Sequence, residues 1–223
     1  ITMLPNSPHV REVITGKNGI LEGISKGKIV VDMSSIAPLV SQEMASLLAE
    51  KGAFFIDAPV SGGEPKAIDG TLAIMAGGSE VVFRKVEEIL KVMGSSVILV
   101  GETGSGNVTK LANQIIVALN IAAVSEAMVL ATKAGVDPEA VFNAIKGGLA
   151  GSTVLNAKMP LILKGNFKPG FRIELHIKDL MNAIDTAHAV GVPVPLTSSV
   201  MEIMQALKVK GREKDDHGGL IQF

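Results

Sequence analysis

The chain has 223 residues, with 21 Lys and Arg against 22 Asp and Glu, so its formal net charge is −1. A chain this close to neutrality lacks the basic field that draws proteins to nucleic acid or to anionic membrane surfaces. It has no cysteine, which excludes disulfides, thiolate metal sites and a cysteine nucleophile, and is typical of the reducing cytoplasm. Hydrophobic residues make up 47% of the chain, enough to bury a substantial core.

In the first hundred residues, short β-rich runs alternate with amphipathic stretches. Strands are predicted at 29–32, 54–56, 72–76 and 97–100, and helices at 38–51 and 81–92. Strands that alternate with helices are typical of βαβ units and of a largely parallel sheet. We therefore predict an α/β domain over residues 1–102.

The pattern changes after Gly101. A helical period runs from 107 to 134 without a helix-breaking residue. Residues 135–138 predict the end of this helix, a turn and the start of the next helix. Further helices are predicted at 139–145, 153–163, 175–190 and 195–209. We predict an all-helical domain over residues 103–223, opened by one long helix.

Two other stretches of this second half carry predictions. The apolar run at 115–124 is interrupted by Asn120 and is too short for a membrane span, so a buried helix is expected there. The charged tail at 210–217 is expected to be loose.

Two common site patterns are excluded. Residues 101–106 have the glycine spacing of a phosphate-binding loop, but Asn107 and Val108 follow where Lys and Ser or Thr are needed. None of the four histidines stands at metal-ligand spacing from another histidine or an acid. We expect no metal site, and surface or packing roles for the histidines.

A polar stripe runs along the predicted long helix. Lys110, Asn113 and Gln114 stand at i, i+3 and i+4, so they share one face, apart from the apolar face that carries Leu111 and Ile115. The stripe is either a solvated face or the lining of a ligand site, and the pattern alone leaves both open. In the second case, a partly desolvated lysine can act as an acid or base or hold a developing oxyanion.

Two loops follow predicted strands. In residues 57–63, Gly62 and Gly63 would let backbone N–H groups approach a carboxylate, with the Ser61 hydroxyl as a further donor. Residues 32–36 form a similar loop at the end of another predicted strand. Open α/β sheets bind ligands at such loops, although an ordinary strand-to-loop turn has the same composition.

Five segments in this order resemble the β-hydroxyacid dehydrogenase family, which includes 3-hydroxyisobutyrate dehydrogenase and tartronate semialdehyde reductase. They are residues 1–5, 32–36, 57–63, 104–114 and 178–180. Residues 64–72 and 147–153 most resemble the tartronate semialdehyde reductases (2-hydroxy-3-oxopropionate reductases) within that family. The resemblance implies a partial Rossmann-type parallel sheet followed by an all-α substrate and dimerisation domain. It also implies NADP or NAD as cofactor, and hydride transfer between NAD(P)H and a small β-hydroxyacid or semialdehyde.

The resemblance also implies roles for individual residues. Lys110 matches the catalytic lysine. The positions that match the substrate site are Ser61, Gly62, Gly63, Asn113 and Gln114. The positions that match the cofactor site are Leu4, Pro5, Ser35 and Lys178.

Several alternatives stay open. Reduction of tartronate semialdehyde to glycerate is favoured, but a sibling enzyme acting on 3-hydroxyisobutyrate, succinic semialdehyde or glyoxylate fits the same motifs. The family places a first βαβ unit, with a glycine loop that helps to choose NADH or NADPH, before the segment where this chain begins. The chain is therefore expected to be incomplete, and an inactive helical dimerisation module is the alternative from another class. A homo-oligomer, either a dimer or a tetramer, is expected.

Overall fold

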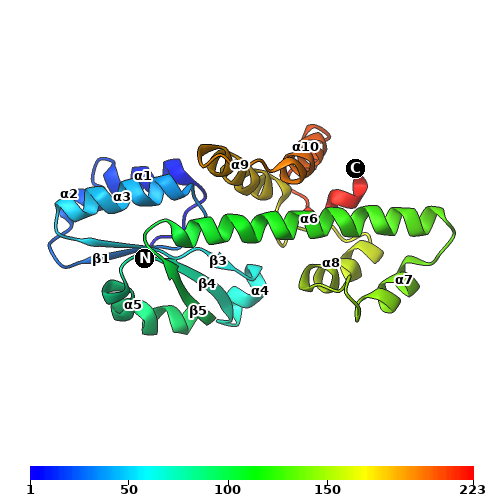
Figure 1. Cartoon of the computed structure of the whole chain (residues 1–223), viewed down its shortest axis with the longest axis horizontal. Coiled ribbons are helices and arrows are strands. Elements are labelled where there is room, and N and C mark those ends of the chain that lie inside the picture. The colour runs from blue at the N-terminus through cyan, green and yellow to red at the C-terminus, as the bar shows by residue number, and fades with distance from the viewer. The chain divides into compact units, whose positions relative to one another are not determined.

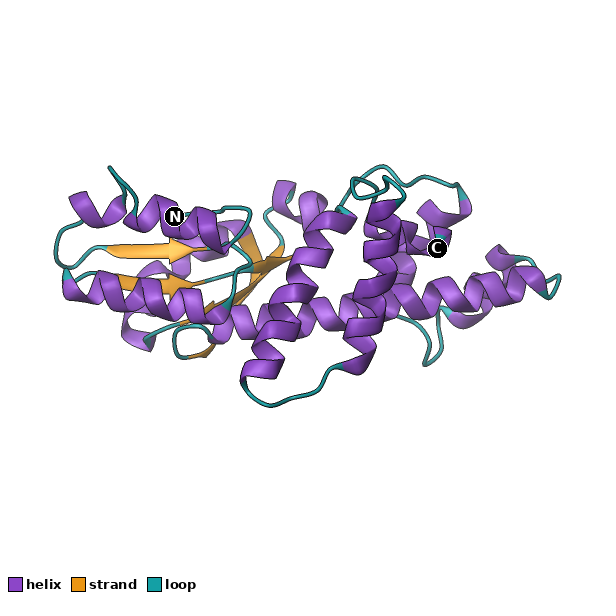
Figure 2. Cartoon of the chain, turned by 90° about the horizontal axis from the view of Figure 1, so that it is seen from above, coloured by secondary structure: helices purple, strands orange, loops and turns teal.

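The computed structural model describes all 223 residues and divides into two compact units, Ile1–Ala112 and Asn113–Phe223. The strands all belong to unit 1, and unit 2 is helical (Figures 1 and 2). This confirms the predicted class, an α/β part followed by an all-helical part. The division falls inside the long helix α6, whereas the domain boundary at residues 102 and 103 stays a prediction.

Unit 1 is built on a five-stranded sheet. Its strands are β1 (Ile29–Asp32), β2 (Phe54–Asp57), β3 (Val60–Ser61), β4 (Leu72–Gly77) and β5 (Gly94–Gly101). The order is β1-β2-β4-β3, with β5 also paired to β4.

The sheet is mixed rather than largely parallel. The pairs β1–β2 and β4–β5 are parallel, whereas β4 runs antiparallel to both β2 and β3. The connections explain this difference. A full crossover helix joins each parallel pair, but only β3 and the short helix α4 (Gly63–Ile68) separate β2 from β4. No crossover returns the chain to the other end of the sheet, so β4 reverses.

Helices cover both faces of this sheet (Figure 1). Helix α5 (Glu80–Met93) packs one face, and its fully buried Leu90 belongs to the core that includes Ile74 of β4. Helices α1 (Ser7–Thr15) and α3 (Pro38–Glu50) belong to the core on β1 and β2, with α2 (Ile20–Gly23) beside them. The proline at the start of α3 takes the first helical position, as predicted. The elements α1, α2, α4 and β3 were not predicted.

Unit 2 is organised around α6 (Ser105–Lys133), which begins in unit 1. Its other elements are α7 (Pro138–Ile145), α8 (Thr153–Leu163), α9 (Ile173–Ala189), α10 (Pro195–Val209) and the 3₁₀ helix η1 (His217–Gln222). Ile121 of α6 shares a core with residues of α9 and α10, and Met128 shares a second core with residues of α8. The predicted bounds of α8 and α10 are confirmed, and so is the Asp137 cap of α7.

Helix α6 is long and apolar enough, by length and composition, to cross a membrane. Within unit 2, however, it is a core helix, because Ala118, Ile121 and Met128 on one face are nearly inaccessible to solvent. Other apolar residues of α6, such as Ile116 and Leu130, are 62% and 72% exposed. The buried helix expected at 115–124 is therefore present, but only one of its faces is covered.

The prediction of a loose tail at 210–217 is wrong for its last two residues. Asp216 and His217 are buried, and Asp216 accepts a cap hydrogen bond from Gly218 at the start of η1. The charge that suggested a solvated tail is instead paired with Lys158 of α8, 2.8 Å away. This partner stands 58 residues earlier in the chain, so no local pattern reveals it.

Candidate functional site

The carboxyl ends of β1 and β2 carry two buried aspartates side by side. Asp32 and Asp57 are register partners in the parallel pair, and both are fully buried. Asp32 Oδ1 accepts hydrogen bonds from the Thr2 hydroxyl (2.9 Å) and the Ser34 hydroxyl (2.6 Å), while Asp32 Oδ2 has no hydrogen-bond partner. Burial raises the pKa of Asp32, although the hydrogen bonds from Ser34 and Thr2 oppose this.

Three of the four predicted cofactor residues lie at this edge of the sheet. Thr2 pairs with Asp32 in parallel, and the Leu4 amide donates to the Ser34 hydroxyl at 2.8 Å. Leu4 and Pro5 are thereby brought to the loop that contains Ser35. Doubly wound sheets bind nucleotides at the carboxyl ends of parallel strands. Pro5 is exposed and Leu4 and Ser35 are partly exposed, so a ligand at this edge could reach them.

Asp57 caps the start of α6 from the neighbouring strand. Its Oδ1 accepts from the Gly104 amide at 2.7 Å, and its Oδ2 accepts from the Asn107 amide at 2.8 Å. Burial raises the pKa of Asp57 to about 6, despite the opposing backbone hydrogen bonds from Gly104 and Asn107. The first turn of α6 is therefore held directly by β2.

The Asn107 side chain ties the same turn to the loop after β1. Its Oδ1 accepts from the Ile36 amide and its Nδ2 donates to the Ser41 hydroxyl, each at 3.0 Å. Asn107 was not predicted as a site residue, because its partners stand 66 and 71 residues away in the chain. Lys110 follows three residues later, so these contacts also fix the position from which Lys110 extends.

The loop of the predicted carboxylate site needs its glycines. Gly62 has φ 142° and Gly63 has φ 69°, both in the region where a side chain is strained. Ser61 lies in β3, paired with Ala73 of β4, and is half-buried, whereas both glycines are exposed. The geometry leaves the backbone at Gly62 and Gly63 accessible to a ligand, and their role stays a prediction.

The polar stripe on α6 is mostly buried. Lys110 is 6% exposed and Gln114 is 4% exposed, while Asn113 between them is half-buried. The alternative of a solvated face is therefore wrong for Lys110 and Gln114. A buried lysine can donate a proton to a reacting oxygen or stabilise negative charge on it.

In unit 2, a carboxylate links three of the predicted residues. Asp179 of α9 accepts a hydrogen bond from Gln114 Nε2 at 2.6 Å, and Gln114 Oε1 accepts from Asn113 Nδ2 at 2.9 Å. Lys178 Nζ forms an ion pair with Asp179 Oδ1 at 2.9 Å. Asp179 stands in the motif at 178–180 but was not predicted as a site residue. Its 1% exposure is the feature that a sequence does not show.

Two family models match the chain. Residues 1–101 match the NAD-binding domain of 6-phosphogluconate dehydrogenase, and residues 104–223 match the NAD-binding model of NADP-dependent 3-hydroxyisobutyrate dehydrogenase. Both descriptions name a nicotinamide cofactor, which agrees with the cofactor that the sequence motifs imply.

Individual relatives agree with these models. The chain is 45% identical over 220 residues to 2-hydroxy-3-oxopropionate reductase of Escherichia coli, covering 99% of this chain and 75% of that protein. It is 37% identical to mitochondrial 3-hydroxyisobutyrate dehydrogenase of Bos taurus, covering 100% of this chain and 68% of that protein. A solved structure of 3-hydroxyisobutyrate dehydrogenase from Mycobacterium tuberculosis with L-serine superimposes with a TM-score of 0.90 at 31% identity, covering 99% of this chain and 77% of that one. The chain therefore belongs to the NAD(P)-dependent β-hydroxyacid dehydrogenase family.

Proposed function

We propose that this protein reduces tartronate semialdehyde to glycerate. The observation that carries the chemistry is the buried Lys110, on the same face of α6 as Asn113 and Gln114. The similarity to 2-hydroxy-3-oxopropionate reductase of Escherichia coli supports this substrate over those of other family members. 2-Hydroxy-3-oxopropionate is another name for tartronate semialdehyde.

The proposed chemistry needs one hydride and one proton. The hydride comes from the bound nicotinamide cofactor and is delivered to the aldehyde carbon. Lys110 donates its proton to the carbonyl oxygen as negative charge develops there, so the product is the neutral alcohol. In the reverse direction, neutral Lys110 accepts the hydroxyl proton. Its burial supports this role, because a proton donor screened from water acts more strongly on the reacting oxygen.

The remaining residues bind and orient. The Ser61 hydroxyl and the amides of Gly62 and Gly63 hold the substrate carboxylate, and Asn113 and Gln114 are the substrate-binding residues of α6. The residues proposed to border the cofactor are Leu4, Pro5, Ser35 and Lys178. The relative solved with L-serine supports a small hydroxy-carboxylate as the class of ligand.

A substrate panel tests this function. NADPH or NADH oxidation is followed with tartronate semialdehyde, succinic semialdehyde and glyoxylate, and the reverse reaction with 3-hydroxyisobutyrate. We expect the highest kcat/KM with tartronate semialdehyde. A higher kcat/KM with another compound would reassign the substrate within the family. Absence of turnover with every compound and both cofactors would overturn the function and favour the inactive helical module.

We further propose that the protein works in the cytoplasm as a homo-oligomer, either a dimer or a tetramer, without a nucleic-acid or membrane partner. The assembly is supported by an apolar groove in unit 2, formed by residues of α6, α10, η1 and the C-terminus. Its lining residues are Ala122, Ser125, Glu126, Val129, Leu130, Ile203, Leu220, Ile221 and Phe223. A second copy of the chain would cover these apolar side chains. The near-neutral net charge of −1 and the absence of cysteine support the other parts of the proposal.

A further inference from the structure

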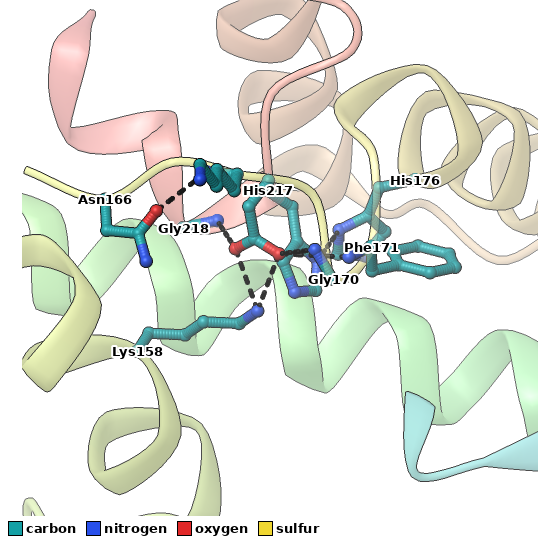
Figure 3. Close-up of polar contacts among 9 residues, drawn as sticks. Lys158, Asn166, Gly170, Phe171, His176, His217 and Gly218 are labelled. Carbon is teal, nitrogen blue, oxygen red and sulfur yellow. Dashed lines mark hydrogen bonds and ion pairs between the residues drawn. The ribbon is translucent and has the colours of Figure 1, made fainter. Parts of the chain in front are cut away.

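Unit 2 contains a buried pair of histidines that the proposed chemistry does not use. His176 of α9 is fully buried and His217 of η1 is 6% exposed, and their Nδ1 atoms lie 2.9 Å apart. The two rings are tilted by 53° with their centroids 4.9 Å apart. They lie beside Phe171 (Figure 3), whose ring centroid is 5.7 Å from that of His176 and 5.2 Å from that of His217. Two imidazoles in contact must share their protons in a defined way, because two N–H groups cannot point at each other.

The contacts assign these protons. His176 Nε2 lies 3.2 Å from the Gln114 carbonyl oxygen, which can only accept, so Nε2 carries a hydrogen. The neutral His176 ring then has its lone pair on Nδ1, and His217 must donate from its own Nδ1. The hydrogen bonds therefore run in one direction, from His217 to His176 and from His176 to Gln114.

His217 is held in place by the residue before it. The Asp216 carboxylate accepts hydrogen bonds from Lys158 Nζ at 2.8 and 3.0 Å and from the amides of Gly170 and Phe171, each at 3.0 Å (Figure 3). The His217 amide also donates to the Phe171 carbonyl at 2.8 Å. These contacts fix the backbone at His217, so its ring has little freedom to leave His176.

Two residues of helix α9 are hydrogen-bonded to Gln114. His176 binds the Gln114 carbonyl, and Asp179, one turn further along α9, binds the Gln114 side chain. The carboxylate also fixes which way the Gln114 amide faces, because the reversed amide would place oxygen against oxygen. The amide oxygen is thereby directed to Asn113.

We propose that His176 is a positioning residue for the reductase reaction, which fixes the turn of α6 that carries Asn113 and Gln114, and that His217 sets the tautomer in which it does so. This inference rests on the proposed function, in which Asn113 and Gln114 bind the substrate. His176 acts through Gln114 and does not contact substrate itself.

The kinetic test compares two replacements of His176. His176→Phe keeps a buried ring and removes the donor, whereas His176→Gln keeps an N–H donor and an acceptor. We expect His176→Phe to raise KM for tartronate semialdehyde about 10-fold with kcat changed less than about 2-fold, because a displaced pocket weakens binding before it impairs proton transfer. His176→Gln should recover KM to within about 3-fold of the wild type. His188→Phe, at an exposed histidine on the same helix, is the control and should leave KM unchanged.

A merely structural role for His176 would lower the active fraction, and so kcat, without raising KM. An unchanged KM in His176→Phe, or a KM in His176→Gln as high as in His176→Phe, would overturn the inference. Wild-type enzyme without turnover would overturn the proposed function and the positioning role together.

A second measurement needs no variant and no activity. Nitrogen-15 NMR of the imidazoles near pH 8 reports which ring nitrogen carries the hydrogen. We expect the Nε2–H tautomer for His176 and the Nδ1–H tautomer for His217. The opposite pair of tautomers would overturn the assigned direction of the hydrogen bonds even if the enzyme reduces the semialdehyde.

Discussion

Single buried polar residues decide most of the site in unit 1. Asp57 and Asn107 have no solvent contact, yet every side-chain oxygen and nitrogen of Asn107 and both oxygens of Asp57 are hydrogen-bonded. A buried polar group left without partners costs free energy, so these groups hold the first turn of α6 in one position. The position of Lys110 follows from theirs.

The buried Asp57 should make the stability of the folded protein depend on pH. Its pKa rises from 3.8 to about 6 because of burial, so the folded state binds this proton more tightly than the unfolded chain. The contribution to stability is complete below about pH 4 and is lost as the pH rises through about 6. The free energy of unfolding of the wild type, relative to Asp57→Asn, should fall by up to about 3 kcal/mol between pH 4 and 7.

Urea unfolding of both proteins at several pH values measures this difference. Asp32, whose pKa is also raised, titrates in both proteins, so its effect cancels to first order in the comparison. A difference that is independent of pH would show that Asp57 does not titrate in this range in the folded state.

The polar residues differ in how far the sequence predicts them. Lys110, Asn113 and Gln114 are found from their spacing, because i, i+3 and i+4 positions share a helix face whatever the tertiary fold. The spacing cannot tell a solvated face from a buried one. Asp179 and the histidine pair could not be found at all, since each acts through a partner at least 41 residues away.

At the scale of the element, helix α6 begins in close contact with the sheet. A Cβ at Gly106 would lie 2.4 Å from the Met75 carbonyl oxygen and 2.7 Å from the Asp57 carbonyl oxygen. Both neighbours are backbone atoms of β4 and β2, which cannot move aside as a flexible side chain can. This glycine is needed for close approach rather than for an unusual backbone conformation.

The variant Gly106→Ala tests this contact. We expect it to lower the free energy of unfolding by about 2 kcal/mol or more, because overpacking forces backbone shifts. Gly147→Ala is the control, since a Cβ there meets nothing within 4 Å. It should change stability by no more than about 0.5 kcal/mol. Equal stability of the two variants in urea unfolding would refute the close contact.

The C-terminal element depends on one ion pair. Burial raises the pKa of Asp216, but the hydrogen bond from Lys158 and the charge of His217 outweigh it, so this pKa lies below its usual value. Asp216→Asn should lower the free energy of unfolding near pH 7 by about 3 kcal/mol, because it leaves the Lys158 charge without its partner. Thermal unfolding against Asp215→Asn measures this.

The control removes a neighbouring carboxylate that faces solvent. Asp215 pairs with Arg212, and both side chains are partly exposed, so its loss should cost at most about 1 kcal/mol. Because the pKa of Asp216 is lowered in the folded state, its stabilising effect is present at a pH above the pKa of the unfolded chain and is lost as the pH falls. The free energies of unfolding of the two variants should therefore converge in acid. Equal stability near pH 7 would contradict the role of Asp216.

Elements were predicted well where the local pattern determines them. The first-turn prolines Pro38 and Pro195 and the Asp137 cap place helix starts within a residue or two, because these signals depend only on neighbouring residues. The prediction of a largely parallel sheet was wrong for β4, because a strand pattern is the same in both directions and the connection decides the direction. The docked end of the tail was missed because its partner, Lys158, lies on another helix.

At the scale of the whole molecule, the predicted order of an α/β part and a helical part is confirmed, because strand-helix alternation and its end at Gly101 are visible in the sequence. The apolar groove of unit 2 was not predicted, because the sequence of an apolar helix does not show which of its faces other helices cover. This groove carries a prediction about assembly.

Light scattering coupled to size exclusion tests the assembly. We expect the wild type to elute as a dimer or a tetramer and Leu130→Asp to shift to the monomer, because a charge would be buried in the apolar groove. Val209→Asp is the control, since Val209 is 88% exposed and does not line the groove. A monomeric wild type at micromolar concentration would contradict the proposed assembly.

The account as a whole depends on Lys110 as the proton donor. The most direct measurement is kcat for tartronate semialdehyde in Lys110→Met, with cofactor affinity followed by fluorescence titration as the control for folding. We predict a loss of kcat of about 10²- to 10⁴-fold with cofactor affinity changed little, since general acid catalysis contributes rate and not cofactor binding. A variant that binds the cofactor and keeps a normal kcat would contradict the proposed chemistry.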